Sequence, residues 1–218
     1  MSAGAHRSAR DVFLYVPNII GYVRVLLAVA SFVYIEQPSR FLPLYGLSCL
    51  LDVADGYAAR QLGQSSRLGA VLDMVTDRST TAGLLCHLVL LYPRGRLAFQ
   101  LLLALDLVSH YAHIYASLTT GATSHKSVGR EGNALLRLYY TSRTVLFLAC
   151  AGNELFFMAL YMVAYQPRLA LFGTRFFLWE SLVGASAPIF AFKQAMNVVQ
   201  LYNAAHQLAS LDAKAKIQ

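Results

Sequence analysis

Charged residues and cysteines are scarce in this sequence. Only 13% of its 218 residues are Asp, Glu, Lys or Arg, whereas 57% are apolar. Soluble domains carry about a quarter charged residues, so this composition argues against a water-soluble fold, and the apolar content argues against disorder. The three cysteines, Cys49, Cys86 and Cys150, lie within apolar runs. An odd number of cysteines in such runs is not typical of a disulfide framework, and we interpret them as small packing residues.

Six mostly apolar stretches are long enough to cross a bilayer, which takes about 20 residues. They are 17–36, 41–61, 69–92, 97–118, 142–165 and 177–204. Because the gaps between them are short, the sequence predicts an all-α polytopic membrane protein built as a six-transmembrane-helix bundle. We expect one domain over 1–218, beginning with a short interfacial segment at 1–16.

The distribution of positive charge predicts the orientation of these helices. The formal net charge is +7, and the loops on the side of the N-terminus carry more Lys and Arg than those on the other side. By the positive-inside rule, both termini are expected in the cytosol. No nucleic-acid-binding pattern is present, so the excess of base favours anionic headgroups or phosphate ligands.

Four aspartates lie where two of the predicted helices meet. Asp52 and Asp55 are three residues apart, and Asp73 and Asp77 are four apart, so each pair shares one helix face. An Asp at the centre of a membrane helix costs roughly 2.5–3.5 kcal/mol on insertion scales, so we expect all four to face inward. A turn over 61–68 folds the two helices into a hairpin, which brings both pairs into one pocket near its end.

Four carboxylates in one pocket repel one another unless cations lie between them. Ion pairs with Arg60, Arg67 and Arg78 would neutralise the charge but would not explain why four acids converge. Carboxylate oxygens are the ligands of hard divalent ions, so the sequence predicts a Mg²⁺ or Mn²⁺ site rather than a zinc site. The expected metal ligands are Asp52, Asp55, Asp73 and Asp77.

Small and basic residues in the same hairpin are suited to a phosphate. Gly56 and Gly69 leave the backbone open to a bulky group, although glycines at such places also serve helix packing. Arg60 is a bidentate phosphate donor by its chemistry, and Ser66 in the turn has a hydroxyl to donate.

The hairpin resembles the signature of the CDP-alcohol phosphatidyltransferases. That signature reads D-x2-D-G-x2-A-R-x8-G-x3-D-x3-D, and every fixed position is filled. Its residues here are Asp52, Asp55, Gly56, Ala59, Arg60, Gly69, Asp73 and Asp77. The segments at 13–24, 121–143 and 150–157 (FLYVPNIIGYVR, GATSHKSVGREGNALLRLYYTSR and CAGNELFF) are similar to the eukaryotic phosphatidylinositol synthase branch of this family.

The resemblance implies an activity. Members of that branch transfer the phosphatidyl group of CDP-diacylglycerol to myo-inositol and release CMP. It implies Mg²⁺ or Mn²⁺ on the four aspartates, contacts from Gly56, Arg60 and Ser66 to the CDP-diacylglycerol headgroup, and Asp77 as the general base. It further implies a homodimer in the endoplasmic reticulum membrane with its active site facing the cytosol.

Two other functions remain open from the residues alone. The motif does not choose the alcohol, so glycerol phosphate, serine, choline or ethanolamine could replace inositol. A divalent-cation transporter would also place aspartates in the membrane, but it is disfavoured because the acids cluster near one face and no helix is broken at the midplane.

Two further groups of polar residues are weaker candidates. Asp106, His110 and His113 have a spacing that could bind zinc, but we expect a polar stripe. Donors and aromatics at the start of the fifth span are either an inositol site or an interfacial anchor. They are Arg137, Tyr139, Tyr140, Thr141, Ser142 and Arg143.

Overall fold

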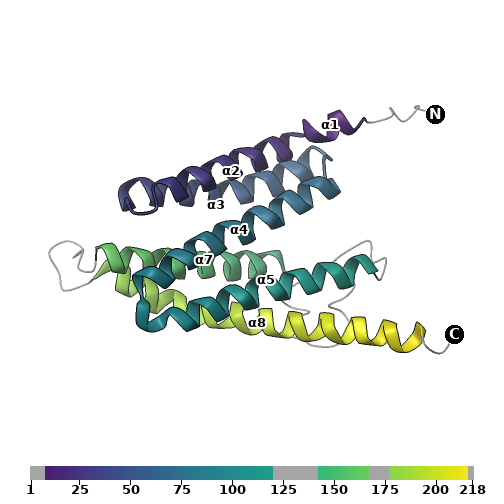
Figure 1. Ribbon diagram of the computed structural model, residues 1–218. Coiled ribbons are helices and arrows are strands. Elements are labelled where there is room, and N and C mark those ends of the chain that lie inside the picture. The colour runs from purple at the N-terminus through teal and green to yellow at the C-terminus, as the bar shows by residue number, and fades with distance from the viewer. Residues whose placement is uncertain (1–7, 120–141, 167–176, 216–218) are drawn as a thin grey trace. The chain divides into compact units, whose positions relative to one another are not determined.

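Helices account for nearly all of the described secondary structure. The computed structural model describes residues 8–119, 142–166 and 177–215. Figure 1 shows the helices α1 (Ala9–Phe13), α2 (Val16–Val33), α3 (Pro38–Gln61), α4 (Arg67–Leu91), α5 (Arg96–Thr119), α7 (Arg143–Tyr165) and α8 (Leu178–Ala215). A single 3-10 turn, Pro93–Gly95, precedes α5.

The six long helices overlap the six predicted spans, and the all-α membrane architecture is confirmed. Over the described residues, four helical segments are long and apolar enough to cross a membrane. They are Val16–Val33, Pro93–Thr119, Thr144–Tyr165 and Leu178–Ala213. The helices α3 and α4, which carry the four aspartates, are not among them. That the chain crosses the membrane six times therefore stays a prediction.

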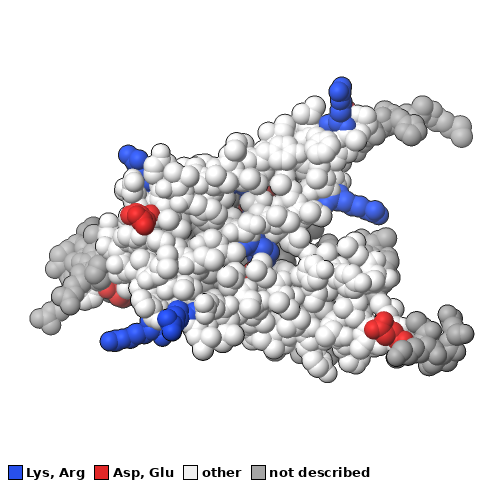
Figure 2. Space-filling model, viewed as in Figure 1, with Lys and Arg blue, Asp and Glu red and all other residues white. Residues whose placement is uncertain are grey.

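The surfaces of the helices are apolar, as a bilayer requires. Large hydrophobic side chains stand exposed, with Val33 and Leu90 at 72% and Leu118 at 76%. On the face shown in Figure 2, most of the described surface carries neither basic nor acidic side chains. An exposed apolar surface of this kind is stable against lipid rather than water.

The buried face of α2 is polar and small, the reverse of a helix in a soluble protein. Its buried residues recur every three or four positions and form one stripe. They are Pro17, Asn18, Gly21, Arg24, Ala28 and Ser31. In a membrane, small residues let helices approach closely and polar residues bond between them, so the stripe faces protein and the Leu and Val side chains face outward.

The chain divides into two compact units, Met1–His87 and Leu88–Gln218, with the boundary inside α4. In the first unit α2 packs along α3. It also meets α4 closely. A Cβ on Gly21 would lie 2.6 Å from Leu72 Cδ2, and one on Gly83 would lie 2.3 Å from the Phe32 ring. The absence of side chains at these glycines is what allows α2 and α4 to pack so closely.

In the second unit α8 packs along both α5 and α7. The rings of Phe156 and Phe190 stack at 4.1 Å, and Phe157 meets Phe190 edge-on. The Gln194 amide donates to Asn153 Oδ1 at 2.8 Å, which ties α8 to α7. That both units form one domain stays a prediction.

Candidate functional site

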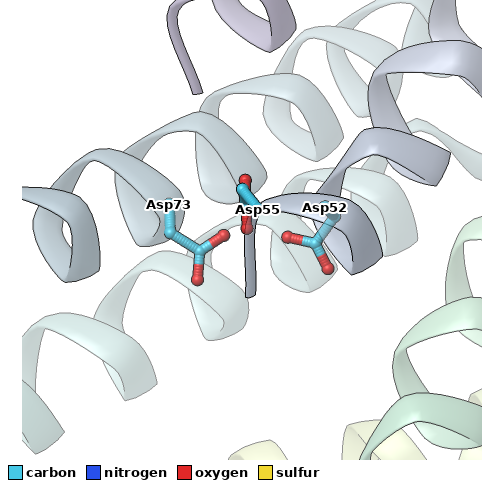
Figure 3. Close-up of side chains that lie close together, drawn as sticks. All are labelled: Asp52, Asp55 and Asp73. Carbon is cyan, nitrogen blue, oxygen red and sulfur yellow. The ribbon is translucent and has the colours of Figure 1, made fainter. Parts of the chain in front are cut away.

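Three of the four aspartates lie together at the end of the α3–α4 hairpin. Asp52 and Asp55 come from α3 and Asp73 from α4, and Figure 3 shows their carboxylates facing one another. One oxygen from each lies within 4.8 Å of the others. The turn that sets this geometry contains Gly63 at φ +59°, a left-handed conformation that glycine adopts without strain. The spacing of the aspartates in the sequence predicts this convergence.

Arg24 of α2 holds all four aspartates. Its Nη1 donates to Asp55 Oδ2 at 2.6 Å and to Asp73 Oδ1 at 2.7 Å. Its Nη2 lies 2.8 Å from Asp52 Oδ1 and donates to Asp77 Oδ1 at 2.5 Å. The Arg24 side chain is 2% exposed, so these ion pairs are buried at its end and depend on good geometry to offset desolvation.

The second oxygen of Asp77, Oδ2, lies 3.7 Å from Arg78 Nη2. Asp77 therefore joins the other three acids through Arg24 and also has a basic neighbour on its own helix. Arg78 was one of the arginines that the sequence suggested as ion-pair partners of the aspartates, and it pairs with Asp77. Arg24 makes the closer contact with Asp77. We call Arg24, Asp52, Asp55, Asp73 and Asp77 the carboxylate cage.

Sequence reasoning missed Arg24. It assigned charges in the first predicted span no role, although the polar and small stripe of α2 repeats at helical spacing and includes this residue. That stripe was the signal available in the sequence. The α2 backbone is fixed beside α3 at the same level, because the Ser48 hydroxyl donates to the Arg24 carbonyl at 3.1 Å.

A cavity of about 170 Å³ adjoins the cage. Its lining includes Asp55 and Asp73 together with Asn18, Gly56 and Ser66. Asn18 is 1% exposed; its amide donates to the Val12 carbonyl, and its Oδ1 finds no donor among the described residues. A buried acceptor without a partner costs free energy, so Asn18 is a point of unsatisfied hydrogen bonding in the wall of this cavity.

The phosphate-binding candidates lie in or beside this cavity. Gly56 lines it, and the Arg60 guanidinium folds across Gly56, with Nη1 3.2 Å from where a Cβ would stand. Ser66 accepts a hydrogen bond from the Gly69 amide at 2.9 Å and so caps the N-terminus of α4. A Cβ on Gly69 would lie 2.7 Å from Asn18 Oδ1, which explains the glycine at this place.

The donor set of the cage fits a hard divalent ion. It offers carboxylate oxygens alone, three of them close enough to share one ion, and it carries more acids than its single buried guanidinium neutralises. Oxygen-only ligands of this kind suit Mg²⁺ or Mn²⁺. Among the described residues no other group of acids, histidines or cysteines gathers in this way.

The zinc alternative on α5 therefore finds no support in the described part of the chain. His110 Nδ1 lies 2.7 Å from the Asp106 carbonyl of its own helix. That these residues form a polar stripe bonded to neighbouring helices stays a prediction. The inositol candidates Arg137, Tyr139, Tyr140 and Thr141 lie outside the described residues. Ser142 is described and caps α7 through the Val145 amide.

Comparison with known proteins agrees with the signature in the hairpin. The model of the CDP-alcohol phosphatidyltransferases matches residues 14–165. The chain belongs to this family. The match includes α2, α3 and α4, which together supply the whole carboxylate cage, so the cage lies within the part that defines the family.

Within the family, the chain is similar to proteins named CDP-diacylglycerol–inositol 3-phosphatidyltransferase. The protein of Saccharomyces cerevisiae is 53% identical over 95% of this chain and 91% of its own length. The protein of Mus musculus is 46% identical, and that of Homo sapiens 45%, each over 93% of this chain and 95% of its own length. No solved structure matches the chain.

Proposed function

We propose that this chain transfers the phosphatidyl group of CDP-diacylglycerol to myo-inositol, forming phosphatidylinositol and CMP. The observation that carries the proposal is its similarity to inositol phosphatidyltransferases from fungi and mammals over more than nine-tenths of its length. Similarity of that extent reaches well beyond the signature hairpin. The carboxylate cage gives the proposal its chemistry.

In the reaction, an inositol hydroxyl oxygen attacks the β-phosphorus of CDP-diacylglycerol. The new bond joins that oxygen to phosphorus, and the bond from the β-phosphorus to the bridging oxygen breaks. The electron pair leaves on CMP. Asp52, Asp55, Asp73 and Asp77 would hold Mg²⁺ or Mn²⁺, which when bound neutralises charge on the pyrophosphate.

The proton of the attacking hydroxyl needs an acceptor, and we assign that role to Asp77. It lies one turn beyond Asp73 along α4, and Arg24 fixes its Oδ1 in place. A carboxylate beside cations is a weak base, so it acts through position: a base held within hydrogen-bond reach of the hydroxyl gains from proximity. General bases contribute typically 10²- to 10⁴-fold to rate.

The cavity beside the cage is proposed to take the cytidine diphosphate headgroup. Gly56 and Ser66 line it, and Arg60 lies across Gly56 with a guanidinium suited to phosphate. Asn18 also lines the cavity, and its buried Oδ1 has no partner among the described residues, so a small shift of this side chain would offer an acceptor to a nucleoside. Donors and acceptors thus lie beside the acids that would bind the metal.

The enzyme is proposed to act as a homodimer in the endoplasmic reticulum membrane, with the α3–α4 turn facing the cytosol. In a chain without its native cysteines, Leu62→Cys in that turn should react with a membrane-impermeant maleimide from the cytosolic side of sealed vesicles. Arg94→Cys, beyond α4, should react only from the lumenal side. Both positions are exposed. Labelling of both cysteines from the same side would contradict a membrane-crossing α4.

The function is tested by incubating the purified protein with CDP-diacylglycerol, Mn²⁺ and a panel of alcohols. Release of CMP with inositol alone is expected. Release with glycerol phosphate, serine, choline or ethanolamine instead would change the acceptor but keep the reaction. No release with any alcohol, together with Mn²⁺ flux into liposomes, would replace the proposal with a cation transporter.

A further inference from the structure

One guanidinium contacts the whole carboxylate cage. Arg24 gives Nη1 to Asp55 and Asp73, and Nη2 to Asp52 and Asp77, at 2.5–2.8 Å. It contacts one carboxylate oxygen of each of the four aspartates. Asp52 and Asp55 come from α3 and Asp73 and Asp77 from α4, so this side chain of α2 connects both arms of the hairpin.

The chemistry of the two partners makes each dependent on the other. An arginine is not deprotonated in proteins, so Arg24, at 2% exposed, is a permanent buried charge. Leaving such a charge or its carboxylates uncompensated is strongly unfavourable. The planar fork of arginine presents two amino groups side by side, which a single ammonium cannot do. The Arg24 Nε has no partner among the described residues. The contacts of the guanidinium with acids are therefore made by Nη1 and Nη2.

A divalent ion in the cage draws on the same negative charge. The oxygens that Arg24 occupies include those of Asp52, Asp55 and Asp73, which form the group suited to a metal. A bound ion would carry the same sign of charge as the guanidinium and would share carboxylate partners with it. Each therefore lowers the affinity of the cage for the other, by the repulsion between like charges at short range.

We propose that Arg24 is the built-in counter-cation of the carboxylate cage, which positions the four aspartates and competes by charge with the divalent ion. It keeps the acids assembled at any metal concentration and sets the metal affinity below what four aspartates alone would give. This inference rests on the metal site of the proposed function. A merely structural arginine would predict the opposite effect on metal binding, because its loss would loosen the ligands.

The first test measures Mn²⁺ affinity by calorimetry on the full-length protein in detergent. Arg24→Met is expected to lower the Mn²⁺ Kd about tenfold or more, because a unit charge beside the ion has been removed. Arg24→Lys, which keeps the charge, should show no such gain in Mn²⁺ affinity. Arg78→Met is the matched control, since the Arg78 guanidinium lies 3.7 Å from Asp77, farther than Arg24 lies from any of the four acids, and the Mn²⁺ Kd of this variant should change less than about threefold. Weaker Mn²⁺ binding by Arg24→Met would overturn the proposal.

The second test uses thermal unfolding in EDTA and does not depend on metal. Asp55 is the most buried of the four side chains, at 10% exposed. Asp55→Asn should lower the unfolding temperature of the wild-type chain, which loses an ion pair. In the Arg24→Met background it should raise that temperature, because it removes an uncompensated buried charge. A decrease in both backgrounds would overturn the proposal.

The second test also covers a failure of the single variant to fold. If Arg24→Met alone gives no folded protein, recovery of folded protein with Arg24→Met plus Asp55→Asn supports the proposal, and failure of the pair overturns it. Wild-type protein that binds no Mn²⁺ would contradict the proposed metal site. In that case the unfolding temperatures of Asp55→Asn in the wild-type and Arg24→Met backgrounds, measured in EDTA, still test whether Arg24 compensates the aspartates.

Discussion

The two units of the chain bury polar side chains in different ways. In Met1–His87 four aspartates, of which Asp55 is buried, pair with the one buried guanidinium of Arg24. In Leu88–Gln218 the Lys193 amine donates to Asn197 Oδ1 at 2.5 Å, and Gln194 bonds to Asn153. Amides both donate and accept, so they complete one another within the protein. Carboxylates only accept, so a surplus of them needs an external cation or donor. We therefore expect the first unit to bind the ligand and the second to serve mainly packing.

The space next to the polar groups also differs between the two units. Beside the cage, the first unit keeps a cavity with an unpartnered amide oxygen. The second unit fills the space between α7 and α8 with stacked rings, and the Tyr92 hydroxyl donates to the Leu160 carbonyl at 2.7 Å. We therefore expect substitutions of equally buried residues to affect ligand binding in the first unit and stability in the second.

The largest effect is expected from two aspartates of equal burial. Asp55 and Asp106 are each 7% exposed, one in each unit. Asp55→Asn should abolish phosphatidyl transfer, with kcat down by about 10³-fold or more and Mn²⁺ binding lost in calorimetry, because a charged ligand of the cage is gone. Asp106→Asn should keep Mn²⁺ affinity within about threefold. Similar losses of Mn²⁺ affinity in both variants would contradict the division between the units.

Asp77→Asn should lower kcat by roughly 10²–10⁴-fold, the usual contribution of a general base. Binding of CDP-diacylglycerol should stay nearly intact, because an interaction used only in the transition state lowers kcat and kcat/KM together. Single-turnover rates across a Mn²⁺ titration, with liponucleotide binding measured in parallel, check this. Recovery of a near wild-type rate at high Mn²⁺ would remove Asp77 from the base role and leave it as a metal ligand.

Two glycines, one beside the cavity and one between packed helices, have no room for a Cβ and can be substituted to compare substrate binding with helix packing. A Cβ at Gly69 would meet Asn18 Oδ1 at 2.7 Å, whereas one at Gly152 would meet Ile189 Cγ2 at 2.4 Å. Gly69→Ala should raise the KM for CDP-diacylglycerol about tenfold by displacing Asn18, which loses about one hydrogen bond. Gly152→Ala should lower the unfolding temperature and leave KM unchanged. Gly184→Ala, with nothing within 4 Å, is the control. A raised KM in Gly152→Ala would link the packing of the second unit to substrate binding.

The smallest effect is expected at the bond between α7 and α8. Gln194→Leu removes the donor to Asn153, and hydrogen bonds between membrane helices contribute on average about 0.6 kcal/mol. Thermal unfolding should show a loss of about 0.5–1.5 kcal/mol, with kcat and KM unchanged. An altered KM for inositol would show that this network acts on the site.

Several features of this protein were predictable from local patterns. Apolar length predicted the helices, and the spacing of Asp52, Asp55, Asp73 and Asp77 predicted that a hairpin would bring acids together, because helix periodicity and a short turn leave few other arrangements. The signature predicted the family, which the comparisons confirm. The roles of individual residues in metal binding and base catalysis remain predictions.

The sequence by itself therefore determined the helices, the hairpin and the presence of a surplus of carboxylates. Only the tertiary structure decided which residues of α2 lie next to these carboxylates. Arg24 precedes Asp52, the nearest cage aspartate in the sequence, by 28 residues. Asn18 is still farther away. No local spacing relates such residues. They reach the cage because α2 packs its small, polar stripe against α3 and α4, and that choice depends on burial across the whole unit.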